Sequence, residues 1–275
     1  MKNIFGISLL FGVFFSFHTA FAQAGETLFF VDGVYDLSDR ATLSATMVFE
    51  GARSSIFIDG EWLGLQSATR QLELKNKAQE LSNEFDTVIY PTLTSVFGSE
   101  WNPGVDGNAR ITILIHPMRQ GAGGYFRTAD EYVQLQSPQS NEREMVYLSV
   151  AAFEHANTKA FLAHEFVHLI TFNQKDRLRG VVEDEWLNEG RAEYAPTLLG
   201  YNNPYEKSML QSRASTFLSN PGNALMEWKG TKEDYGILSM FVHYLADQYG
   251  ITTLSESMQS KKVGIASLME VLKKY

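Results

Sequence analysis

Two histidines and a glutamate interrupt an apolar segment in the second half of the sequence. The segment "FLAHEFVHLI" covers residues 161–170 and contains His164, Glu165 and His168. On a helix, residues four apart project about 40° from each other, so His164 and His168 can direct both imidazoles at one ion. This spacing suits a tetrahedral Zn²⁺, and Glu165 lies where it can reach a water on the ion as general base. The alternative interpretation is that the histidines are ordinary core or surface residues.

An acidic segment, "EDEWLNEGRAEY" (183–194), follows the histidine segment in the sequence. Its apolar and small positions predict a helix on which Glu189 and Glu193 again stand four residues apart. A catalytic zinc site has three protein ligands and one open position, and Glu189 can supply the third ligand if the two helices pack together. Glu193 can then hydrogen-bond the free ring nitrogen of a ligating histidine. We expect residues 183–185 to be a solvated helix face, which is also the alternative interpretation for Glu189.

Peptide hydrolysis at such a centre also needs a donor for the oxyanion. The candidate donors are Tyr194, Tyr201, Tyr235 and His243. We favour Tyr235 because it precedes Gly236 at a predicted helix start, where a side chain can turn into a cleft. The alternative is that Tyr235, one of twelve tyrosines, only packs in the core.

The elements that must position these residues change in character along the chain. Strands are predicted at 27–31, 41–49, 54–60, 110–116 and 144–150, and 120–126 reads as a loop. Helices are predicted from Thr69 to Val88 and then at 157–174, 186–200, 204–218, 233–250 and 264–275. This order predicts an α+β fold, in which a small N-terminal antiparallel sheet is followed by a mixed sheet, the His-Glu-x-x-His helix and a mainly helical C-terminal half.

Three further features have simpler interpretations. The segment "MVYLSV" (145–150) is a candidate exposed edge strand for an extended substrate, unless it is central in the sheet. "VDGN" (105–108) offers oxygen ligands for Ca²⁺ but lacks the spaced acidic series of a calcium loop, so we interpret it as a turn. His116 and His155 have no partner at ligand spacing, and we expect both to be structural.

The N-terminus and the composition restrict the cellular setting. Lys2 precedes an apolar stretch from residue 4 to 17 that ends near Ala20 and Ala22, a pattern typical of a secretory signal peptide over residues 1–22. The stretch is shorter than the roughly 18–20 apolar residues of a membrane span, so we expect a secreted or periplasmic protein without stable membrane insertion after cleavage. The net charge of −9 argues against nucleic acid as the main partner, and the absence of cysteine leaves only His and carboxylate as metal ligands.

The two motifs resemble those of a known group of enzymes. "HEFVH" followed by "WLNEGRAEY" is similar to the gluzincin metallopeptidases, in which a glutamate on a second helix completes the zinc site. With the segments "FFVDG", "EFDTVIYPTLTSVFG" and "GGYF", the chain looks closest to the hyicolysin-type secreted bacterial metallopeptidases. The resemblance implies a zincin-like catalytic domain over 69–275 behind a β-rich region at 23–68. It also implies Zn²⁺ as cofactor and a protein or peptide substrate.

Two other functions remain open at this point. The chain can be a non-catalytic envelope or binding protein that retains the scaffold, with zinc as a structural ion. It can also be a zinc hydrolase that acts on cell-wall peptides. Glu165 argues against the first alternative, because a structural zinc site needs no base beside its ligands.

Overall fold

The structure of the chain is a computed structural model and describes residues 25–275. The predicted signal peptide, residues 1–22, lies outside these residues. The strands are β1 (Glu26–Phe30), β2 (Thr42–Glu50), β3 (Ser54–Asp59), β4 (Ile111–His116), β5 (Gly124–Phe126) and β6 (Met145–Ser149). The helices are α1 (Gly60–Gly64), α2 (Ala68–Glu84), α3 (Tyr90–Phe97), α4 (Val150–Glu154), α5 (Thr158–Thr171), α6 (Glu185–Leu198), α7 (Met209–Ser219), α8 (Lys232–Tyr249), α9 (Thr252–Met258) and α10 (Gly264–Leu272). In this part of the chain no helix is long and apolar enough to cross a membrane.

All six strands form one mixed sheet in the order β1-β2-β3-β4-β6-β5. The first three strands are antiparallel, β3, β4 and β6 are parallel, and β5 runs antiparallel to β6. The predicted α+β class with a mixed sheet is therefore confirmed. The three N-terminal strands are not a separate small sheet, because β3 pairs with β4 from Ser54 to Ile58 and joins them to the rest.

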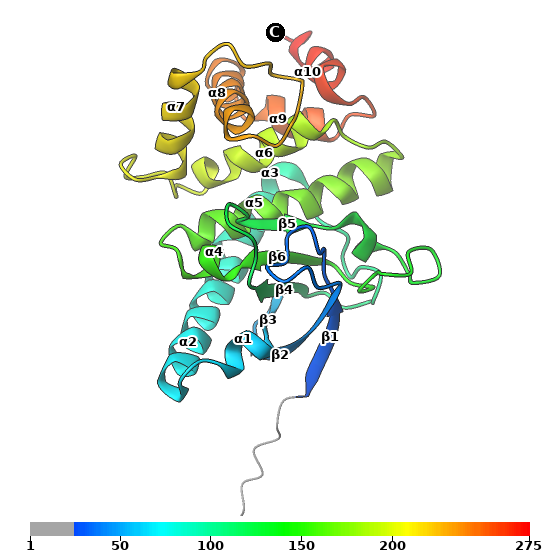
Figure 1. The fold of residues 1–275 in the computed structure, drawn as a ribbon. Helices are drawn as coiled ribbons and strands as arrows, with labels where there is room; N and C mark the ends of the chain where they lie inside the picture. Colours follow the sequence, from blue (N-terminus) through cyan, green and yellow to red (C-terminus); the bar gives the residue numbers. More distant parts are fainter. Residues whose placement is uncertain (1–24) are drawn as a thin grey trace, which may run out of the picture.

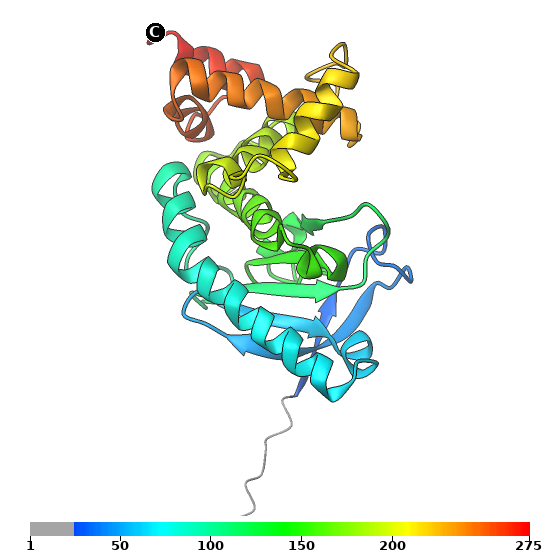
Figure 2. The same cartoon turned by 90° about the vertical axis from the view of Figure 1, so that its left-hand side faces the viewer.

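The central strands are apolar on both faces because both faces are covered. Ile113 and Ile115 of β4 point into the larger core with helix residues such as Phe166, whereas Leu114 points into a second core on the other face. Figure 2 shows α2 running along the first face, and α5 packs beside it. The C-terminal helices lie beyond the β5 edge of the sheet (Figure 1). The helix with the two histidines is thus enclosed between the sheet and α6.

The structure corrects two strand predictions near this edge. Residues 124–126, predicted as part of a loop, form the edge strand β5. The segment 145–150 contains β6, which pairs with β4 on one side and β5 on the other, so its candidacy as an exposed edge strand was wrong. A three-residue strand is too short to show the alternation that identifies strands in sequence.

The helical half follows the predicted pattern with differences at its ends. The helix predicted from 204 begins at Met209, where Ser208 accepts a hydrogen bond from the backbone N–H of Gln211 and caps it. Short helices α4 and α9 were not predicted. Beyond its regular part, α5 continues as a π-helical segment, Phe172–Arg177, so this helix reaches further than the periodicity indicated.

Candidate metal centre

The polar residues of helix α5 lie in the interior of the protein. All residues from Leu162 to Thr171 are buried, because the sheet covers one side of the helix and α6 covers another. His164, Glu165 and His168 are 8%, 5% and 6% exposed. Buried polar side chains are costly unless they find partners, so these residues require an explanation beyond packing.

His164, His168 and Glu189 converge across the contact between α5 and α6. His164 Nε2 lies 3.2 Å from Glu189 Oε2, and His168 Nε2 lies 3.6 Å from Glu189 Oε1. One ligand atom from each residue lies within 4.8 Å of the others, and among residues 25–275 no other group of three such side chains does so. The predicted ligand positions are therefore brought together, and the three residues could hold a metal ion.

The hydrogen bonding of these side chains fits a bound cation. Glu189 Oε2 is buried without a hydrogen-bond partner, although His164 Nε2 is only 3.2 Å away. The pair is close but not aligned for a hydrogen bond, and a buried acceptor without a partner costs about 1–3 kcal/mol. Two imidazoles and a carboxylate suit Zn²⁺ and also other transition metals, so the donor set indicates a class of ion rather than one element.

The electrostatics of the metal-free centre describe a strongly coupled group. Although burial alone would raise the pKa of Glu189, His168 and the neighbouring His164 lower it to about 2. Burial acts against protonation of His164, but the Glu189 carboxylate dominates and raises the pKa of His164 to about 9. Burial lowers the pKa of His168, which keeps that imidazole neutral and able to ligate.

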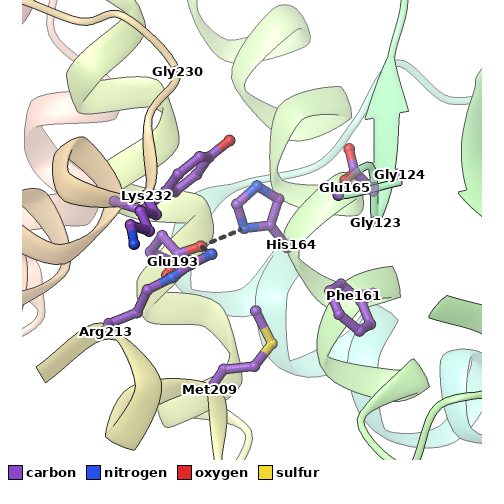
Figure 3. A pocket seen from close by; sticks show the side chains of 12 residues that line it. Gly123, Gly124, Phe161, His164, Glu165, Glu193, Met209, Arg213, Gly230 and Lys232 are labelled. Atoms are coloured by element: carbon purple, nitrogen blue, oxygen red, sulfur yellow. Dashed lines mark hydrogen bonds and ion pairs between the residues drawn. The ribbon is translucent and has the colours of Figure 1, made fainter. Parts of the chain in front are cut away.

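Glu165 faces the other side of the site from Glu193. Figure 3 shows its carboxylate beside Gly123 and Gly124. A Cβ atom on Gly124 would lie 2.8 Å from Glu165 Oε1 and 2.5 Å from the backbone oxygen of Tyr147, so only glycine fits at the start of β5. Burial raises the pKa of Glu165 to about 8, which gives this carboxyl a proton affinity suited to acid–base chemistry near neutral pH.

Arg213 is a residue of this site that the sequence interpretation missed. Glu193 Oε1 lies 3.5 Å from His164 Nδ1, close to the nitrogen that it was predicted to bond, but that nitrogen has no hydrogen-bond partner in this structure. Arg213, from α7, donates to both oxygens of Glu193, from Nε at 2.7 Å and from Nη2 at 2.8 Å. This two-point contact fixes the carboxylate that faces His164 (Figure 3). The only sequence signal is an arginine twenty residues downstream, which does not distinguish it from any other arginine.

Tyr235 is the one candidate oxyanion donor that lines the pocket at this site. The pocket has a volume of about 230 Å³ and also exposes His164, Glu165, Glu193 and Arg213. Burial and the nearby glutamates raise the pKa of Tyr235, so its hydroxyl keeps its proton and can donate.

The other three candidate donors do not line this pocket. The Tyr201 hydroxyl donates to Glu84 at 2.8 Å, and His243 lies 2.7 Å from the Thr197 hydroxyl, with the Tyr194 ring against it.

Three other residues with a role predicted from the sequence lie outside the centre. His116 is buried and lies 3.2 Å from both Asp36 Oδ2 and the Tyr125 hydroxyl, which agrees with a structural role. His155 accepts a hydrogen bond from the backbone N–H of Asn157 beside α5. Glu183, expected on a solvated face, is 7% exposed and pairs with Arg191 at 2.6 Å, so that expectation was wrong.

Sequence relationships add nothing to this description. Comparison of the chain with models of known protein families and with curated protein sequences found no match. The chemistry of the centre therefore has to be inferred from the residues that form it.

Proposed function

We propose that the chain is a zinc-dependent metallopeptidase of the gluzincin type with a zincin-like catalytic domain. The observation that carries the proposal is the convergence of two imidazoles and one carboxylate, with a buried carboxyl of raised pKa adjacent to them. Only three such ligands converge among the described residues, which leaves a coordination position for a reactant. A structural zinc site is instead closed by four protein ligands.

The roles of the residues follow from their positions. His164, His168 and Glu189 would hold the ion, which when bound supplies a Lewis acid and lowers the pKa of water. Glu165 takes a proton from the attacking water and returns it to the leaving amine. The hydroxyl of Tyr235 donates a hydrogen bond to the oxygen that becomes negative on the reacting carbonyl.

The substrate would be an extended peptide that lies along β5. This strand has a partner on one side only, and Gly124 at its start borders the same pocket as Glu165. A free strand edge offers backbone hydrogen bonds to any extended chain, so it recognises peptide rather than one particular side chain. We also propose that the protein is exported, because residues 1–22 have the pattern of a secretory signal peptide.

The decisive experiment compares the wild type with Glu165→Gln. We expect the variant to keep its metal, because Glu165 is not a ligand, and to lose peptide hydrolysis by at least about a thousandfold, since both proton transfers need its carboxylate. The matched control is Glu80→Gln, which changes an exposed glutamate on α2. Hydrolysis of denatured protein should remain unchanged in that control. Full activity in Glu165→Gln would exclude the proposed mechanism.

A further inference from the structure

A second group of carboxylates is buried away from the histidines. Glu100, Glu131 and Glu144 are each no more than 2% exposed. They come from three places in the chain: the turn-rich loop after α3, the 3₁₀ turn Thr128–Glu131, and the residue before β6. The backbone N–H of Arg143 donates to the backbone oxygen of Asp130 at 3.0 Å, which joins the second and third places.

Four oxygens of these carboxylates have no partner. They are Glu100 Oε2, both oxygens of Glu131, and Glu144 Oε2. The opposite oxygen of Glu100 accepts from the Tyr90 hydroxyl at 2.9 Å, and that of Glu144 accepts from the backbone N–H of Val105 at 2.8 Å. Two carboxylates are thus held at one oxygen with the other left free, while neither carboxylate oxygen of Glu131 has a hydrogen-bond partner.

None of these three carboxylates forms an ion pair among the described residues, although Arg177 acts against the rise that burial causes in the pKa of Glu131. Arg127, near Glu131 in sequence, pairs with Asp130 at 3.6 Å, and the guanidinium of Arg177 lies over the Trp101 ring at 3.4 Å. Burial raises the pKa of Glu131 well above its usual value, and among charged neighbours Glu144 contributes most to that rise. The two carboxyls therefore lie near enough to repel each other.

The backbone of the loop is shaped around Glu144. Gly104 has a φ of 85°, and a Cβ atom there would lie 1.6 Å from Glu144 Oε2. Asp106 in the same loop is exposed, and its Oδ1 accepts from the backbone N–H of Asn108 at 2.8 Å, so the "VDGN" segment is a turn as expected. The loop therefore packs closely against Glu144, but it does not supply the Ca²⁺ ligands that its "VDGN" sequence suggested.

We propose that Glu100, Glu131 and Glu144 bind a divalent cation of the Ca²⁺ type through their four unpartnered oxygens. An all-oxygen, multiply charged donor set is that of a hard cation, and Ca²⁺ accepts six to eight ligands in flexible geometry. These oxygens do not meet the 4.8 Å spacing of the histidine centre, so the ion draws the carboxylates inward and completes its shell with backbone oxygens or water. It would tie the loop after α3 to the start of β6.

The test is calcium titration of the chelator-treated full chain, followed by calorimetry and by thermal unfolding. We expect one calcium per chain and a rise in Tm of about 5 °C or more at saturation. Glu131→Gln and Glu144→Gln should each weaken binding by at least about tenfold, because they remove ligand charge. The exposed Glu80→Gln is the matched control and should bind as the wild type does.

The double variant His164→Ala, His168→Ala separates this site from the metallopeptidase centre. It should still bind calcium, so the result does not depend on the proposed function. Calcium that fails to bind the wild type, or that leaves its Tm unchanged, would show that the buried carboxyls are kept neutral by protons. Binding that survives Glu131→Gln and Glu144→Gln but is lost in the histidine variant would overturn the assignment to these residues.

Discussion

Two buried clusters of charged or titratable side chains lie where the α5 region meets the α6 region. They differ in how fully their carboxylates are paired. At one end, Glu183 pairs with Arg191 at 2.6 Å and with Lys175 at 3.1 Å, and its other oxygen accepts from the backbone N–H of Gly264. At the other end, Glu189 faces His164 and His168, and one of its oxygens has no hydrogen bond. The first anion is neutralised by the chain itself, whereas the second belongs to a group of side chains that could hold a metal ion.

The two clusters also differ in the parts of the chain that they contact. Lys175 also donates to three backbone oxygens near the C-terminus, those of Ser257, Ser260 and Lys262, so the first cluster ties the end of the α5 region to the segments around α9 and α10. The histidine cluster joins α5 to α6, and its His164 lines a pocket. Both clusters bury charge, but only the second leaves a carboxylate oxygen, Glu189 Oε2, without a hydrogen-bond partner.

The strongest effect should be a loss of stability when the cluster around Glu183 is broken. Glu183→Gln leaves Lys175 and Arg191 buried without their anion and should lower the free energy of unfolding by about 3–5 kcal/mol. Glu189→Gln in the metal-free chain should cost much less, because His164 can release its proton. Urea denaturation of both variants in the presence of a chelator measures the two losses. Equal losses would show that the clusters do not differ as described.

The difference in unfolding free energy between the wild type and Glu183→Gln should depend on pH. Burial would raise the pKa of Glu183, but Arg191, the Gly264 amide and Lys175 together lower it below its ordinary value of 4.5. A lowered pKa in the folded state stabilises the protein above pH 4.5, and the contribution is lost as the pH falls through the folded value. The gap in unfolding free energy between wild type and Glu183→Gln should therefore be full at pH 7 and should narrow as the pH falls below 4.5. A gap that stays constant in acid would contradict this.

A smaller effect is expected at the residues that orient His164. Glu193→Gln should weaken metal binding by about 10–100-fold, and Arg213→Met by less, because Glu193 keeps its charge but loses its alignment. Competition with a chromogenic chelator measures both affinities. Arg70→Met, which changes an exposed arginine on α2, is the control. Unchanged affinity in Glu193→Gln would remove this carboxylate from the site.

Local relations could be predicted from the sequence, and relations between distant segments could not. The spacing within "HEFVH" determines how His164 and His168 project because one helix holds both. Glu189 and Glu193 followed from a second helix of the same kind. Arg213 depends on how α7 packs, which no periodicity encodes.

Two features were misjudged from the sequence, and only the second had a signal that can be named afterwards. Glu183 looked like one of three solvent-exposed acids, and its burial follows from Lys175 and Arg191, which approach it only in the folded chain. The pair Gly123 and Gly124 read as loop flexibility, although each glycine permits a close approach to α5. Adjacent glycines before a short aromatic segment were therefore a signal of proximity.

The metal content of the purified chain shows whether His164, His168 and Glu189 form a metal centre. Elemental analysis should find about one equivalent of zinc in the wild type and in Glu165→Gln, and almost none in His164→Ala or His168→Ala, because each loses a ligand. The Glu80→Gln chain should match the wild type. Zinc that remains bound when both histidines are replaced, or a wild type that binds no transition metal, would contradict the assignment of His164, His168 and Glu189 as a metal centre.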